Sequence, residues 1–168
     1  DYYGLQEDKL ANINKIFGIQ EKVAKLYPDT EEKKVIDNLV SKIKSQELNV
    51  QAEKYLNENQ NTPIQLTHKN LTKVFVKIFA YNEGFDGKQK LQVLNVYNDN
   101  RIADAQKFLN SLKVVDQYAI DVKSFDDFQE HATIVKLNPL KAGRYIVLFS
   151  NNAEFKINTK DEIDFLDV

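Results

Sequence analysis

The spacing of the apolar residues changes near position 47, and this change constrains the fold more than any other feature of the sequence. Before it, apolar residues such as Leu10 and Ile13 recur at helical spacing. After it, they alternate with polar residues, beginning at Leu48. One segment cannot bury a stripe of both periods, because helices and strands place successive side chains differently. We therefore predict a helical lead-in over residues 1–46 and a β-rich domain over residues 47–168.

The lead-in is predicted to be a helical hairpin. Its first helix ends near Tyr27-Pro28, and Asp29 or Thr30 then stands where an N-cap belongs. Lys33 occupies the third position after Thr30 in place of an acid, so the capping box is incomplete. The short connection favours an antiparallel pair of helices. The apolar stripes comprise Leu10, Ile13, Ile16, Phe17, Val23 and Ala24 in the first helix, and Val35, Ile36, Leu39, Val40 and Ile43 in the second.

The second part is predicted to be an immunoglobulin-like antiparallel β-sandwich, so that the whole chain is α+β by content. Its strongest strand runs from Val74 to Tyr81 and is apolar on both faces, which indicates a central strand or one covered by another layer. Seven or so short strands separated by turn residues favour a sandwich, since a parallel sheet needs a helix at each crossover. One helix near 101–112 would be an insertion. The predicted strands lie within 48–52, 64–68, 74–81, 91–97, 118–122, 133–137, 145–149 and 163–168.

Composition excludes several classes of protein. With 23 basic and 25 acidic residues, the net charge is -2, which disfavours nucleic acid as a partner. Because cysteine is absent, disulfides, thiolate catalysis and cysteine-type zinc sites are excluded. No apolar run is long enough to span a bilayer, so we expect no membrane contact by this chain. The first residue is not methionine, and we expect the chain to be a processed piece of a longer protein whose targeting signal lies elsewhere.

One stretch gathers ionisable groups that could do chemistry. In FDDFQEHAT, the residues Asp126, Asp127, Glu130 and His131 could form a cation site or an acid–base pair. Their spacing matches neither a calcium loop nor a HExxH motif, and a polar turn before a strand explains the same residues. His68 alternates with apolar neighbours on a predicted strand, so we interpret it as a packed or edge histidine.

The remaining motifs give no reaction centre. Neither a glycine-rich phosphate loop nor a GxSxG elbow occurs. We therefore expect no enzyme, assign no catalytic, cofactor-binding or metal-binding residue, and leave binding residues open. The aromatic residues could form a sugar-binding platform, but their alternation favours core positions. They are Phe75, Phe79, Tyr81, Tyr97, Tyr118, Tyr145 and Phe149.

Three stretches, taken in order, resemble the bacterial alpha-2-macroglobulin-like proteins over residues 27 to 168. YPDTEEKKVIDNLVSKIKSQELNVQAEKY is similar to the family's helix and first strand, and NTPIQLTHKNLTKVFVKIFAYN to a strand, turn and alternating strand. DFQEHATIVKLNPLKAGRYIVLFSNN resembles the closing segment of a macroglobulin domain, with its L-x-x-G-x-Y step. The matching positions of that segment are Asp127, Phe128, Gln129, His131, Leu140, Gly143 and Tyr145.

The resemblance implies a function that the residues alone do not. It implies a macroglobulin-type sandwich over 47–168, used as a structural module of an envelope-located, periplasmic or outer-membrane-anchored protein that inhibits proteases by trapping them. Its partners would be other domains of the same longer chain and, through the full-length protein, proteases. Residues 1–26 would fit a further helix of a tetratricopeptide-like array. The family's thioester cysteine is missing here. The alternative function is a carbohydrate- or peptide-binding sandwich of a bacterial surface protein.

Overall fold

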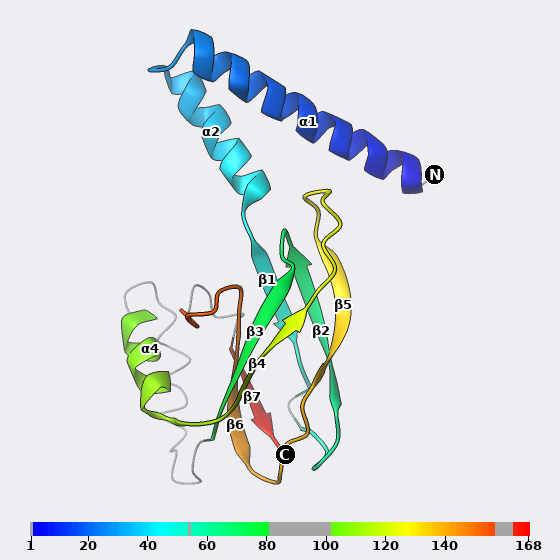
Figure 1. The fold of residues 1–168 in the computed structure, drawn as a ribbon, viewed down its shortest axis with the longest axis vertical. Helices are drawn as coiled ribbons and strands as arrows, with labels where there is room; N and C mark the ends of the chain where they lie inside the picture. Colours follow the sequence, from blue (N-terminus) through cyan, green and yellow to red (C-terminus); the bar gives the residue numbers. More distant parts are fainter. Residues whose placement is uncertain (1, 54, 81–101, 157–162) are drawn as a thin grey trace. The chain divides into compact units, whose positions relative to one another are not determined.

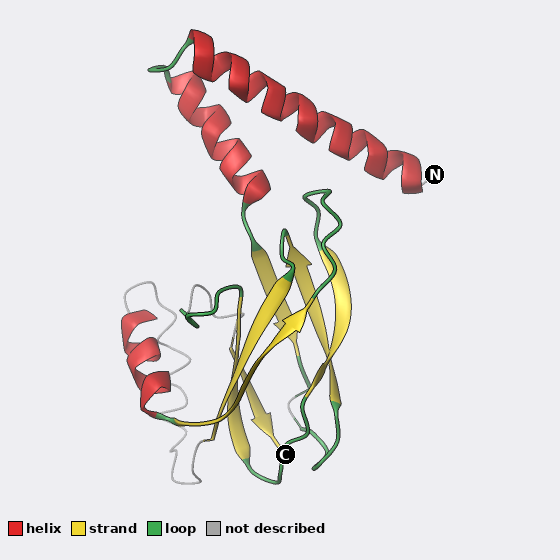
Figure 2. Ribbon diagram, in the orientation of Figure 1, coloured by secondary structure: helices red, strands yellow, loops and turns green. Residues whose placement is uncertain are grey.

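Three helices and seven strands make up the described part of the chain, which covers residues 2–53, 55–80, 102–156 and 163–168 of the computed structural model (Figure 1, Figure 2). The α+β content predicted from the sequence is confirmed. The helices are α1 (Tyr2–Leu26), α2 (Glu31–Lys44) and α4 (Ile102–Ser111). The strands are β1 (Glu47–Gln51), β2 (Thr62–Lys69), β3 (Lys73–Ala80), β4 (Lys113–Asp121), β5 (His131–Leu137), β6 (Arg144–Ser150) and β7 (Ile163–Asp167). The predicted strand at 91–97 lies outside the described residues.

The chain divides into two compact units. Unit 1 consists of Asp1–Gln46 and a short segment from the middle of the chain, Phe125–Gln129. Unit 2 consists of Glu47–Ser124 and Glu130–Val168. The polypeptide therefore passes between the units at three places, after residues 46, 124 and 129.

In unit 1, α1 and α2 form the predicted helical hairpin. Thr30 is the N-cap of α2, and its hydroxyl oxygen accepts a hydrogen bond from the Lys33 backbone N–H at 3.3 Å. The Gln20 side-chain amide of α1 donates to an Asp37 carboxylate oxygen of α2 at 2.8 Å. Lys33 lies 2.5 Å from the other oxygen of Asp37. In the described residues, no helix is both long and apolar enough to cross a membrane.

The apolar stripes predicted for the two helices are only partly buried. Ile13 and Val40 are buried, as predicted. Ala24, Val35 and Leu39 are exposed, so the prediction that they face a partner helix is wrong for these three positions within this unit. The physical reason is that one neighbouring helix covers only part of the circumference of another.

Unit 2 is an antiparallel sandwich of two sheets. One sheet has the strand order β1-β2-β5 and the other has β4-β3-β6-β7. β3 pairs with β4 on one side and β6 on the other, so it is central, as predicted. In the constant-type immunoglobulin domain the fourth strand belongs to the four-stranded sheet that holds the first two strands. Here β4 joins the sheet of β3 instead.

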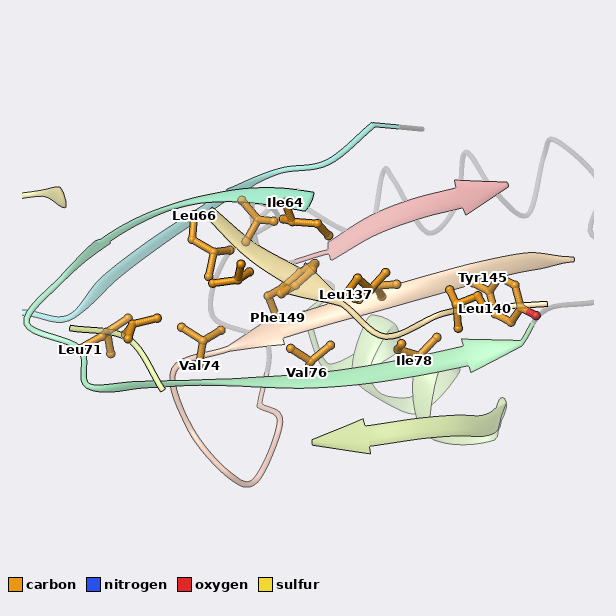
Figure 3. Close-up of a cluster of buried hydrophobic side chains, with 14 residues drawn as sticks. Ile64, Leu66, Leu71, Val74, Val76, Ile78, Leu137, Leu140, Tyr145 and Phe149 are labelled. Atoms are coloured by element: carbon orange, nitrogen blue, oxygen red, sulfur yellow. The ribbon is translucent and has the colours of Figure 1, made fainter. Parts of the chain in front are cut away.

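The principal core lies between the two sheets (Figure 3). Ile64 and Leu66 of β2 point toward Val76 of β3 and Phe149 of β6, and each of the four is at most 1% exposed. A second cluster covers the outer face of the four-stranded sheet. It consists of Phe79, Leu109, Ile146, Leu148 and Phe155, with Phe75, Phe108 and Leu112 packed against it. The predicted inserted helix, α4, therefore contributes to this second layer.

A tight corner precedes β6. The Tyr145 hydroxyl donates a hydrogen bond to the Lys141 carbonyl at 2.9 Å, and Tyr145 and Leu140 are both buried. Gly143 has φ +158, and a Cβ there would lie 3.2 Å from the Tyr145 hydroxyl. Gly143 and Val168 exchange two backbone hydrogen bonds of 2.9 and 2.8 Å, which extend the pairing of β6 and β7. This arrangement has the features of the tyrosine corner of immunoglobulin-like sandwiches.

Replacing Gly143 with alanine is expected to destabilise unit 2 by about 1 to 3 kcal/mol, because the new Cβ would press on the tyrosine ring in a backbone conformation that favours glycine. Urea unfolding followed by far-ultraviolet circular dichroism measures the change. Gly18→Ala is the matched control, since a Cβ at Gly18 meets no atom within 4 Å. The control should be neutral or stabilise by up to about 1 kcal/mol. Equal losses in the two variants would contradict the role given to the corner.

Candidate functional site

The strand register brings the two histidines of the chain together. β2 pairs with β5 so that His68 lies directly opposite His131, and this is the last matched pair at that end of the ladder. His68 alternates with Leu66 and therefore lies on the face that points into the sandwich. It is 2% exposed, whereas His131 is partly exposed. On its other side, His68 is opposite Leu48 of β1.

The surroundings of His68 favour its neutral form. Burial is the main cause that lowers the pKa of its imidazole below the ordinary value, and the charge on protonated His131 lowers it further. At neutral pH the ring therefore carries one N–H and one nitrogen lone pair. His68 was predicted to be a packed or an edge histidine, and its burial confirms the packed alternative. The effect of His131 on the pKa of His68 was not predicted.

The four ionisable groups of FDDFQEH are divided between the two units. Asp126 and Asp127 belong to unit 1, whereas Glu130 and His131 belong to unit 2. An Asp127 carboxylate oxygen accepts a hydrogen bond from the Gln129 backbone N–H at 3.0 Å, as in an Asx turn. Within the described ranges, no group of three or more His, Asp or Glu side chains could hold a metal ion. The cation site considered from the sequence therefore gains no support from the structure.

Phe128 anchors this turn to the helices of unit 1. Its ring meets the Phe17 ring edge-to-face, with centroids 5.3 Å apart and an interplanar angle of 84°. The Lys44 ammonium group lies 4.9 Å from the centroid of the same Phe17 ring. Asp126 and Phe128 both have positive φ, 54° and 58°, which makes the segment a tight turn. The sequence analysis missed this anchor because Phe17 and Phe128 are far apart along the chain.

Most of the described aromatic residues considered as a binding platform are parts of the two cores. Phe79, Tyr145 and Phe149 are between 0% and 7% exposed, so the prediction of core positions is confirmed for them. Phe75 is half-buried and meets the Phe155 ring edge-to-face at 6.2 Å. Tyr118 is also half-buried. Tyr81 and Tyr97 lie outside the described residues.

Tyr118 links the two sheets at their β4 and β5 edges. Its hydroxyl oxygen accepts a hydrogen bond from the Asn138 backbone N–H at 3.1 Å, just after β5 ends. The Asn138 side-chain amide donates to an Asp116 carboxylate oxygen of β4 at 3.0 Å. Burial raises the pKa of the Tyr118 hydroxyl, and the Asn138 hydrogen bond partly opposes this shift. The hydroxyl therefore has a structural role, and it gives no support to the alternative of a sugar-binding platform.

Comparison with known proteins gives distant likenesses. No protein-family model and no curated protein matches the chain. Among solved structures, it is similar to native alpha-2-macroglobulin from Escherichia coli spanning domains NIE-MG1, with 14% identity and a TM-score of 0.47 over 74% of this chain and 61% of that chain. It is also similar to the CARDB domain of a Pyrococcus furiosus protein in complex with di-metal ions, with 9% identity and a TM-score of 0.30 over 74% of this chain and 90% of that chain. The assignment of the sandwich rests on the strand pairing of this chain.

The burial of His68 makes the stability of unit 2 depend on pH. Because the pKa of His68 is lower in the folded state than its ordinary value of about 6.5, the unfolded chain takes up a proton more readily. The histidine contribution to stability is therefore complete above that ordinary value and is lost as the pH falls below it. Urea unfolding at a series of pH values from 7.5 downward should show this loss, and His68→Gln should reduce the slope. If the free energy of unfolding depends on pH equally steeply in His68→Gln, the role given to His68 is contradicted.

Replacing Phe128 with alanine is expected to destabilise unit 1 by about 1 to 3 kcal/mol, because the edge-to-face contact and the burial of the ring are lost. Thermal unfolding followed by the helical signal in far-ultraviolet circular dichroism measures the change. Phe125→Ala is the matched control, because that ring belongs to the same segment and is 48% exposed. If both substitutions lower helical stability equally, Phe128 is not the anchor.

Proposed function

We propose that the chain is a non-catalytic structural and interaction module of a bacterial alpha-2-macroglobulin-like protein that traps proteases. The observation that carries this proposal is the corner before β6. The L-x-x-G-x-Y step, one of several matches that together carry the sequence resemblance, is the segment in which Tyr145 bonds back to Lys141 and Gly143 pairs with Val168. Two of the residues that match the family pattern, Gly143 and Tyr145, therefore stabilise the corner. This agreement supports a family relationship at the level of a scaffold domain.

The distribution of buried side chains in unit 2 also supports a scaffold role. β6 is buried from Tyr145 to Ser150, and its apolar side chains are shared between the two cores. Among the described residues, the buried polar or charged side chains are His68, Lys69 and Ser150. Lys69 forms an ion pair with Glu47 on the adjacent strand. The described interior is thus devoted to packing, which is what a module between other domains requires.

The exposed apolar residues of unit 1 support contacts with other domains of a longer chain. Val35 and Leu39 are four residues apart on α2 and share one side of the helix, where they are 69% and 42% exposed. Ile19 and Leu26 of α1 are 50% and 69% exposed. Apolar side chains that recur along a helix face are typical of surfaces that another protein segment covers. We propose that neighbouring domains of the same polypeptide fill this role.

The family resemblance further supports a location in the bacterial cell envelope, either periplasmic or anchored at the outer membrane. Proteases would then be partners of the full-length protein. This chain would contribute as a spacer or as part of the enclosing wall. The chain spans less than two thirds of the Escherichia coli fragment to which it is similar, so these properties of the whole protein belong to the proposal.

The full-length protein is expected to retain an added protease after its own chain has been cleaved. The measurement is size-exclusion chromatography of the mixture, with an active protease that carries a fluorescent label away from its active site so that its elution can be followed. A catalytically inactivated protease is the control, because trapping that depends on cleavage should not retain it. If the active protease elutes only at the volume of the unbound protease, the proposed trapping role is contradicted. The assignment of the sandwich fold would be unaffected.

A further inference from the structure

We propose that His68 and His131 form a two-histidine site for a borderline transition-metal ion such as Zn²⁺, at the end of the β2–β5 ladder. The directly opposite positions of the two histidines on paired strands are the observation that carries this inference. Imidazole suits zinc, copper and nickel, whereas magnesium and calcium prefer oxygen ligands. The site goes beyond the proposed scaffold function and does not depend on it.

The cross-strand geometry suits a shared metal ion. Directly opposite residues of antiparallel strands have Cβ atoms roughly 4.5 to 5.5 Å apart on the same face. Two nitrogens that each bind zinc at about 2.0 to 2.1 Å in a tetrahedral arrangement are separated by about 3.3 Å. Imidazole rings that extend in parallel from such Cβ positions can reach that separation by rotation about their side-chain bonds. The register of His68 and His131 therefore supplies two of the four ligands of a tetrahedral site.

The hydrogen-bonding capacity of an imidazole ring is compatible with metal binding. A neutral imidazole can coordinate through one nitrogen while the other keeps a hydrogen bond. The interactions that His131 makes elsewhere therefore do not prevent coordination.

Access and the remaining ligands also follow from the position of the pair. His131 is the first residue of β5 and is partly exposed, so the pair has one solvent-accessible member. No third His, Asp or Glu of the described residues completes a ligand group. The remaining positions would be taken by water or by a group from another molecule. A closed structural zinc site has four protein ligands, so this site would differ from one by having two.

The two residues were not combined in the sequence analysis because the pairing is not local. His68 and His131 lie on either side of β3, α4 and β4 in the sequence, and only the pairing of β2 with β5 makes them neighbours. Metal-binding motifs that can be recognised in a sequence, such as HExxH, have their ligands at short, fixed spacing. A cross-strand pair has no fixed spacing and requires the register.

The test uses the chain as it is, with zinc chloride as the probe at pH 7.5 and the midpoint of thermal unfolding as the first readout. Zinc should raise the midpoint saturably, nickel and copper should also do so, and magnesium and calcium should not. His131→Gln, which changes the more exposed partner, should weaken zinc binding measured by calorimetry roughly tenfold or more. Lowering the pH below about 6.5 should also weaken binding, because protons compete for the imidazoles.

Imidazole resonances give a second readout that does not depend on stability. The chain has two histidines, so zinc should shift or broaden the ring signals of both at the same metal concentration. His68→Gln and the double variant should abolish the effect, provided that circular dichroism shows them folded. Zinc that leaves both ring signals unchanged would overturn the proposal. An equal zinc response in wild type and in His131→Gln would also overturn it, since carboxylates elsewhere would then account for the binding.

Discussion

The double burial of the four-stranded sheet is the constraint on which unit 2 depends. Val76 and Phe149 face the other sheet, while Phe79 and Ile146 face the cluster that includes α4. A strand that is apolar on both faces is stable only between two layers, which explains why a helix is needed outside the sandwich. Such a strand also lacks an alternating pattern that could fix its register, because a shift by one residue would still bury apolar groups. At one end of β6, the two backbone hydrogen bonds between Gly143 and Val168 fix its register against β7.

Much of this architecture follows from periodicity. The change near position 47, the central position of β3 and the inserted helix near 101–112 were predictable, because each depends on the repeat of apolar residues along one element. The exposure of Val35 and Leu39 was not predictable in this way. An amphipathic stripe tells which side of a helix avoids water, but it does not tell whether the partner belongs to the same compact unit.

The candidate site was less predictable than the fold. His68 could be recognised as a packed residue from its alternation, and the Asp127 turn from its composition. The pairing of His68 with His131 and the contact of Phe17 with Phe128 depend on which segments become neighbours in space. Each of these contacts joins residues that are distant in the sequence, and many other pairs of segments could pack equally well. A single sequence carries little information about which pair forms. Because these contacts are not local, no local motif in the sequence marks the site.

The inclusion of Phe125–Gln129 in the helical unit has a genealogical consequence. A domain encoded by one continuous stretch can be exchanged between genes as a cassette. Unit 1 is not one continuous stretch, because Phe125–Gln129 is encoded between two strands of unit 2. A copy of residues 1–46 alone would therefore lack the Phe128 ring that meets Phe17. An insertion or deletion in the loop around Phe128 would have to preserve the ring contact with Phe17. We therefore expect the length of this loop to vary less among related proteins than is usual for surface loops.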